Sequence, residues 1–209
     1  MTPLKQERPT FSVSQIEKIL QNASPQMKAM IWLGLNCGLG FTDCAELRWK
    51  NLDLQNGRVD LPRGKTGLAR SLPLWSETVD ALNEVPVSGE LVFYTWKGNS
   101  WVRAVKGVGK DGKQKYRRTN NVTKEFSKLM KKARIHAPKG VGFYTLRWTA
   151  ATLTGRSGVP FAVQRLLGHA NLKMATTGSR LARDGGLFWG FYYRRHQQQG
   201  RQLLSCLHG

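Results

Sequence analysis

The sequence predicts an α+β fold, in which a mainly helical domain carries a small antiparallel β-sheet. Apolar residues recur at helical spacing in several segments, for example at Leu146, Ala150 and Leu153. In the first half, the turn dipeptide Asn56-Gly57 accompanies two short segments that are typical of paired strands. At 209 residues, the chain is long enough for one compact domain with a sizeable core.

Capping signals and turns predict the elements of the first half. Ser14, three residues before Glu17, predicts a capping box at the start of a helix, and Ser24 followed by Pro25 starts another. Thr42 is expected to cap a third helix. The sequence further predicts strands at 58–61 and 69–74 around a loop at 62–68, a helix at 76–85, and a strand or extended piece at 91–94.

A basic segment and a basic helix follow. Residues 97–118 are rich in glycine, lysine and arginine, and we expect a mobile loop or hairpin that either lies along phosphates or is merely solvated. Residues 121–135 are predicted as a helix with a buried face formed by Val122, Phe126, Leu129 and Ala133. The basic residues of this helix face largely outward, which suits contacts to a nucleic-acid backbone: Lys128, Lys131, Lys132 and Arg134.

The charge favours a polyanionic partner. Lys and Arg number 33 against 13 Asp and Glu, which gives a formal net charge of +20. Binding to nucleic acid would then weaken steeply with salt, because bound counterions are released. A protein that is merely basic, or a structural binder of the ribosomal kind, is the alternative interpretation.

The three cysteines, Cys37, Cys44 and Cys206, are odd in number and lack CxxC spacing, so they predict neither a disulfide scaffold nor a metal site. The start of the chain does not resemble a signal peptide, and no apolar run approaches the length needed to span a bilayer. We therefore expect a soluble, cytoplasmic protein with no membrane partner.

Residues 142–177 bring an arginine and a histidine to two adjacent helix ends. Arg147 lies one position off the apolar face of the first helix, so we expect it to point towards a groove. Gly155 and Gly158 are expected to end that helix, and a second helix, begun by Pro160, delivers His169 at its end. Guanidinium binds phosphate bidentately and imidazole can donate to it, so the pair suits a phosphate.

This segment resembles the catalytic domain of the tyrosine recombinases, the phage integrase family. The resemblance rests on the combination of L-R-x-T-x-A-T, a glycine break, Q-x-L-L-G-H and a Thr pair. It implies binding to double-stranded DNA, breaking and rejoining of strands through a phosphotyrosyl link without a metal or cofactor, and assembly as a homo-oligomer on DNA. These features are expectations for this chain.

Three of the six positions that carry the family's chemistry are retained. The resemblance implies that Lys65 is the general acid towards the departing sugar oxygen, that Arg147 clamps the scissile phosphate, and that His169 donates to it. An isolated Lys-Thr-Gly would be a solvated turn. The flanking strand pattern and the order of the other segments favour the functional interpretation.

The other three positions depart from the family. Gly40 stands at the first arginine, Tyr144 at the histidine before the second arginine, and Gly178 at the nucleophilic tyrosine. Arg48 lies in the same segment as Gly40, but the resemblance implies a structural role for it. Loss of the nucleophile predicts an impaired recombinase.

We expect residues 1–178 to form the catalytic domain, with no separate amino-terminal domain, and residues 179–209 to form an atypical tail. The tail lacks clean periodicity, so it is either the product of a frameshift or truncation, or a divergent segment that docks on a partner subunit. Tyr192 or Tyr193 within it could in principle replace the missing nucleophile.

Other function classes stay open. A non-catalytic remnant of an integrase would bind DNA without forming a covalent adduct. An RNA-binding structural protein is possible on charge alone, although the sequence has no RNP-type aromatic motif. A metal-dependent nuclease is disfavoured because the candidate acids form no recognisable metal-ligand motif: Asp43, Glu46, Asp53 and Asp60.

Overall fold

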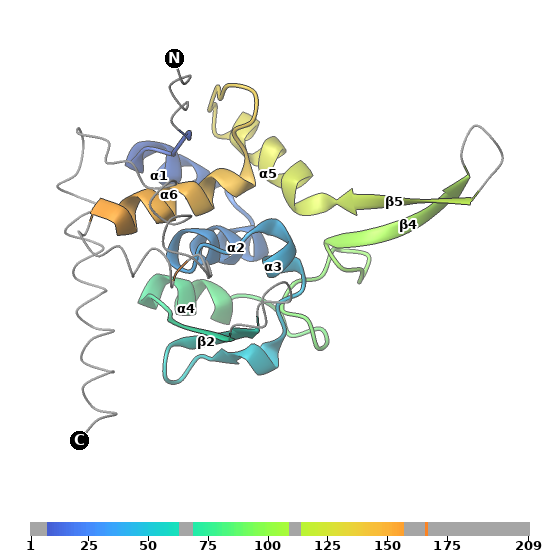
Figure 1. Cartoon of the computed structure of the whole chain (residues 1–209), viewed down its shortest axis with the longest axis horizontal. Helices are drawn as coiled ribbons and strands as arrows, with labels where there is room; N and C mark the ends of the chain where they lie inside the picture. The colour runs from blue at the N-terminus through green and yellow to red at the C-terminus, as the bar shows by residue number, and fades with distance from the viewer. Residues whose placement is uncertain (1–7, 63–68, 109–113, 157–165, 167–209) are drawn as a thin grey trace, which may run out of the picture.

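The computed structural model describes residues 8–62, 69–108, 114–156 and 166, and it confirms an α+β fold (Figure 1). In chain order, its elements are α1 (Val13–Asn22), α2 (Pro25–Asn36), α3 (Phe41–Ala45), the 3-10 turn η1 (Trp49–Asn51), β1 (Leu52–Asp53), β2 (Arg58–Pro62), β3 (Ala69–Pro73), α4 (Ser76–Asn83), β4 (Val102–Val108), β5 (Gln114–Asn120), α5 (Asn121–Lys132) and α6 (Phe143–Arg156).

The described strands form two small antiparallel sheets, where the sequence predicted one. The first sheet has the order β1-β2-β3, with Val59 opposite Leu72, so the predicted strands at 58–61 and 69–74 are confirmed. The second sheet is the two-stranded β4–β5 hairpin, which projects away from the helices (Figure 1). The basic segment 97–118 is therefore largely a hairpin. Residues 91–94 form no strand, because only Leu91 pairs, in a single bridge with Arg48.

The first helix begins earlier than its predicted capping box. Its N-cap is Ser12, whose hydroxyl accepts from the Gln15 amide at 3.3 Å, while the Gln15 side chain accepts from the Ser12 amide at 2.9 Å. The predicted box from Ser14 to Glu17 is wrong, since the same reciprocal pairing is made two residues before it. The predicted start of α2 at Pro25 after Ser24 is confirmed.

Helix α2 lies at the centre of the core and packs against α4 and α6 (Figure 1). The approach to α6 is close at Gly34, where an added Cβ would lie 3.0 Å from the Cβ of Leu146. On the other flank of α6, the fully buried ring of Phe126 makes edge-to-face contacts with Phe11 and Phe143 at centroid distances of 6.0 and 5.4 Å. These contacts fix the start of α6 against α2 and α5.

One buried amide joins the end of α2 to the start of α4. The Asn36 side chain donates to the Pro73 carbonyl at 3.1 Å. Its oxygen accepts from the Trp75 amide at 2.8 Å and from the Thr78 hydroxyl at 3.1 Å. Because buried polar groups cost free energy when unpaired, these bonds stabilise one arrangement of α2, β3 and α4.

The cysteines of the described core are unreactive. Cys37 and Cys44 are both buried and free. Burial raises the pKa of the Cys37 thiol to about 12, although the nearby Arg70 charge opposes the shift. Burial also raises the pKa of Cys44 well above its usual value, so both thiols stay protonated at neutral pH. Cys206 lies outside the described residues.

Each helix that the structure describes is too short or too polar to cross a lipid bilayer.

Candidate functional site

Arg147 is buried in the second turn of α6, with 6% of its surface exposed. Its guanidinium Nη1 donates to the backbone carbonyl of Gly38, in the loop between α2 and α3. In this structure the Arg147 side chain is therefore largely enclosed, whereas the sequence analysis expected it to face a groove. The reason is that α6 is enclosed well beyond its apolar stripe, since Ala151 and Thr154, on the Arg147 flank, are buried too.

The loop that receives Arg147 depends on a glycine. Gly38 follows the last turn of α2 and has a φ of 61°, a left-handed conformation that side chains with a Cβ rarely adopt. The adjoining amide of Leu39 donates back to the Leu33 carbonyl at 3.3 Å. The turn is thus held on one side by α2 and on the other by the guanidinium of Arg147.

Helix α3 begins at Phe41 with Gly40 as its N-cap, so the prediction that Thr42 caps this helix is wrong. The Gly40 amide donates to the Asp43 carboxylate at 3.0 Å, and Gly40 itself offers no side chain to cap the helix. Thr42 has a different role, because its hydroxyl accepts from Arg118 Nη2 at 3.0 Å. A guanidinium from β5 is therefore bound to the first turn of α3.

Gly40 and Tyr144, two positions that depart from the family pattern, are neighbours in space. A Cβ on Gly40 would lie 3.5 Å from the Tyr144 ring and 3.6 Å from the Asp43 carboxylate, which are ordinary contact distances. Tyr144 is 43% exposed, and its ring stands edge-to-face with Trp148 at 5.5 Å. The guanidinium of Arg8 lies 3.5 Å above Trp148. The structure therefore brings Gly40 and Tyr144 to the same end of α6 as Arg147.

Two other predicted site residues, Lys65 and His169, lie outside the described residues.

Arg70, which the sequence analysis did not single out, is buried and donates to the Leu166 carbonyl at 3.4 Å, three residues before His169. A signal for it existed, because Arg70 pairs with the buried Leu61 and so occupies a core-facing strand position. Several further predictions also fall outside: the helix from Pro160, the Gly178 position, and Tyr192 and Tyr193.

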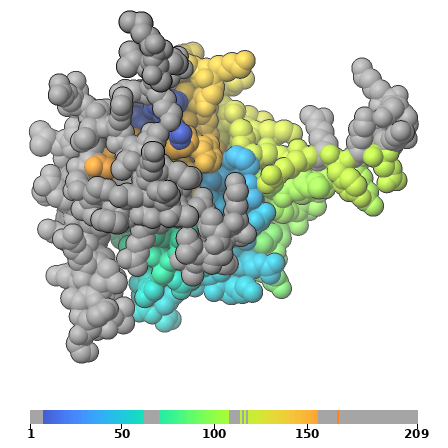
Figure 2. Space-filling model, viewed as in Figure 1, coloured from blue at the N-terminus to red at the C-terminus, as the bar shows by residue number. Residues whose placement is uncertain are grey.

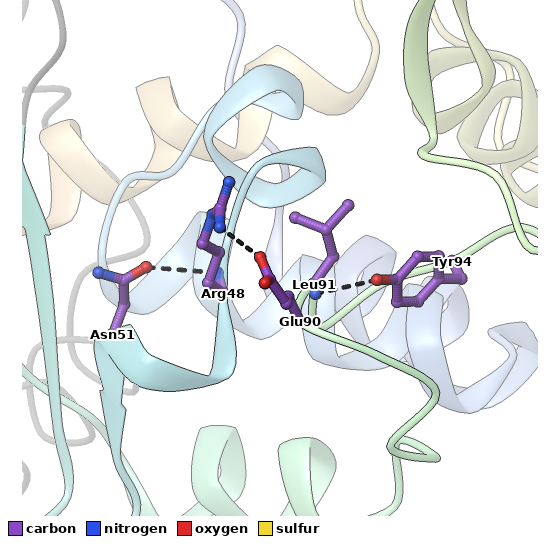
Figure 3. Close-up of polar contacts among 5 residues, drawn as sticks. All are labelled: Arg48, Asn51, Glu90, Leu91 and Tyr94. Carbon is purple, nitrogen blue, oxygen red and sulfur yellow. Dashed lines mark hydrogen bonds and ion pairs between the residues drawn. The ribbon is translucent and has the colours of Figure 1, made fainter.

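Arg48 has a structural role, as the resemblance implied (Figure 3). Its guanidinium forms an ion pair with Glu90 at 2.5 Å, and its amide donates to the Asn51 side chain at 3.4 Å. Beside it, the Leu91 amide donates to the Tyr94 hydroxyl at 3.1 Å. The ion pair joins residues 47–51 to residues 90–94, together with the backbone bonds from Trp49 to Glu90 and from Val92 to Leu47.

The four acids considered for a metal site are not gathered into one, and the described residues hold no group of three potential metal ligands. They are Asp43, Glu46, Asp53 and Asp60. Hydrogen bonds from the side chain and backbone of Asn56 lower the pKa of the Asp53 carboxyl. Asp60 lies 4.0 Å from Arg58 in the same strand. Asp43 caps α3, so these three carboxylates have local partners.

Known proteins share this fold. The structure of the XerA recombinase superposes with a TM-score of 0.68 at 19% identity, over 86% of this chain and 62% of that one. The Tn1549 transposon integrase, solved with transposon right end DNA, gives 0.63 at 19% identity, over 88% of this chain and 65% of that one. A lambda integrase dimer bound to a COC' core site gives 0.64 at 17% identity, over 88% and 52%.

This chain therefore spans between about half and two-thirds of the length of these three solved proteins. No protein of curated function matches the sequence. The family model described as "Phage integrase family" matches residues 9–180. Because that match covers most of the 209 residues, this chain belongs to the phage integrase family.

Proposed function

We propose that this protein binds double-stranded DNA as a site-specific recombinase of the tyrosine type whose strand-cleaving chemistry is impaired. The observation that carries the proposal is the position of Arg147. Its guanidinium is fixed against the loop before α3, beside Gly40 and Tyr144, in a chain of this family with a net charge of +20. We propose Lys65 as the general acid towards the departing sugar oxygen, and Arg147 and His169 as the residues that contact the scissile phosphate.

The chemistry requires both fixed donors and a nucleophile. Phosphoryl transfer concentrates negative charge on the phosphate oxygens, and donors that are already in position stabilise that charge. Arg147 supplies one such group, but Gly40 supplies none where the family carries a second arginine. Removal of one comparable donor costs about 2.7 to 4 kcal/mol of transition-state stabilisation. Since position 178 is glycine, no tyrosine stands where the family has its nucleophile.

The partner and the organisation of the chain follow from the same proposal. The Tn1549 integrase was solved with DNA, and the lambda integrase was solved as a dimer on its core site. We extend both properties to this chain, as a DNA partner and a homo-oligomer on DNA, acting in the cytoplasm. Residues 1–178 would form the catalytic domain and residues 179–209 a tail with a separate role.

The first experiment measures duplex binding and covalent capture together. A labelled duplex is titrated by fluorescence anisotropy between 50 and 200 mM salt, concentrations at which a protein with 6 to 10 phosphate contacts loses about 10³ to 10⁵ in affinity. The same protein is incubated with nicked duplexes and denatured in detergent. We expect salt-sensitive binding without a covalent adduct. An adduct would reveal a substitute nucleophile, and absence of binding would overturn the proposal.

Restoring a cation at position 40 should tighten DNA binding. Gly40→Arg suits the backbone, because Gly40 has a φ of −84° and an added Cβ makes only ordinary contacts. Since Gly40 is buried, a thermal melt of the variant checks that it folds. One new charged contact to phosphate should raise affinity about tenfold or more and steepen the salt slope by about 0.9.

Two variants control for this effect. Gly40→Gln fills similar space without charge, and Val87→Arg adds the same charge at a side chain that is 75% exposed and far along the chain. If Gly40→Arg and Val87→Arg bind DNA equally well, only the net charge of the protein matters. That result would contradict the idea that a side chain at position 40 contacts a DNA phosphate.

A further inference from the structure

The root of the β4–β5 hairpin forms a groove with the start of α5. The groove has a volume of about 310 Å³ and is lined by residues 105–107 and 118–120 and by Lys124. The hairpin itself projects beyond the rest of the described molecule (Figure 2). The groove is therefore open to a large partner, and its lining does not include Arg147, Gly40 or Tyr144.

The strand register places two cations of the groove, Lys106 and Arg118, on the same face of the hairpin. Lys106 is opposite Tyr116, and Arg118 is the next residue of β5 on that face. Diagonal neighbours of this kind lie about 7 to 8 Å apart, so the two cations can contact different oxygens or neighbouring phosphates. Tyr116, between them, is 68% exposed. Lys124, in the first turn of α5, adds a third cation to the groove.

The chain segments that line the groove contain no acidic residue. Residues 102–108 and 114–124 contain no Asp or Glu. The next acid along the chain, Glu125, is paired with Lys128 at 2.7 Å. In the part of the chain that the structure describes, neither Lys106 nor Lys124 forms an ion pair. Such a surface attracts an anion strongly at low salt.

The helix terminus is not the source of this attraction. The Asn120 side chain already accepts from the amide of Thr123 at 3.1 Å, so α5 is capped from within. The lining side chains therefore supply the charge. The bond from Arg118 to the Thr42 hydroxyl at 3.0 Å fixes the groove relative to α3, whose first residue follows Gly40.

We propose that this groove is a second phosphate-binding site, which holds the backbone of double-stranded DNA through Lys106, Arg118 and Lys124. The proposal rests on the proposed function and adds a contact outside the Arg147 site. DNA backbone is favoured over a free phosphate ion because the groove is open and the cations extend along an exposed hairpin with a tyrosine between them.

The test compares the salt dependence of duplex binding in matched double variants. Lys106→Gln with Lys124→Gln should weaken binding at least tenfold at 100 mM salt and reduce the slope of log affinity against log salt by about 1 to 2. The control, Lys18→Gln with Lys50→Gln, removes the same charge from exposed positions on α1 and η1 and should change the slope little. All four side chains are exposed, so both variants should fold.

The outcomes separate the groove from the proposed function. If the unaltered protein binds duplex and the two double variants lose affinity and slope equally, the groove proposal is overturned while DNA binding stands. If the unaltered protein does not bind duplex at all, both proposals fail. A selective loss in the groove variant supports the site.

A second pair distinguishes a ligand role of Arg118 from a positioning role. Arg118→Gln removes the cation, whereas Thr42→Val removes only its hydrogen-bond acceptor in α3. If Arg118 binds phosphate, Arg118→Gln lowers the salt slope by about 0.9 and Thr42→Val leaves it unchanged. Equal losses in both variants would show that Arg118 only holds the hairpin against α3, and would remove it from the site.

Discussion

Replacing Phe126 with alanine should lower the free energy of unfolding by about 3 to 5 kcal/mol. The ring is fully buried and contacts Phe11 and Phe143 edge-to-face, so truncation leaves a cavity that three separate chain segments would have to fill. Urea denaturation followed by circular dichroism measures the change. Because typical domains are stable by only about 5 to 15 kcal/mol, the variant should be close to unfolding at 37 °C.

The control for this substitution is Val87→Ala, at an exposed side chain, which should change stability by less than about 0.5 kcal/mol. Phe143 opens α6, the helix that carries Arg147, so Phe126→Ala should also weaken DNA binding at temperatures where it stays folded. A loss below about 1 kcal/mol would mean that the three rings do not form a tightly packed cluster in solution.

Replacing Arg147 with alanine should weaken duplex binding about 10- to 100-fold, since a charged hydrogen-bonding group contributes about 1.5 to 3 kcal/mol. Lys106→Ala should cost less than about fivefold by itself, because Lys106 is an exposed, flexible cation and one of three in its groove. Fluorescence anisotropy at one fixed salt concentration measures both. Equal losses would count against a phosphate site at Arg147.

The loss in the Arg147 variant must be separated from a loss of folding. Arg147→Ala removes a donor from the Gly38 carbonyl, which should destabilise the protein by about 1 to 3 kcal/mol. Arg147→Lys keeps the positive charge but loses the planar guanidinium. Compared with Arg147→Ala, it should therefore regain part of the lost stability and a smaller part of the lost DNA affinity. Thermal melts of both variants show how much protein is folded during the binding measurement.

Local patterns in the sequence predicted most elements because their causes are local. The inward face of α5, which includes Val122 and Phe126, follows from helical spacing and is confirmed. The β2–β3 pairing follows from two short strand-like segments on either side of the loop at 62–68, and it is confirmed. The Asn56-Gly57 turn instead joins β1 to β2. Capping was less predictable, because several polar residues near each helix start could serve, and Ser12 and Gly40 are the observed caps.

The site was harder to predict because it depends on contacts between distant segments. The sequence identified Arg147, but its burial results from the loop at residues 38–40, about 109 positions away in the chain. The bond between Arg118 and Thr42 spans 76 positions and has no local signal. Arg70 was detectable, since it is a charge at an inward strand position. The roles of Lys65 and His169 in the site stay predictions.

The hydrogen bonds of Asn36 have a consequence for how the molecule opens. One side chain accepts from the first turn of α4 and donates to the end of β3, while its own backbone ends α2. A local fluctuation that releases α4 must therefore also release the last turn of α2, and these segments should exchange their amide hydrogens as one cooperative unit. Gly38 lies two residues after Asn36, so release of α4 should also loosen the loop that receives Arg147.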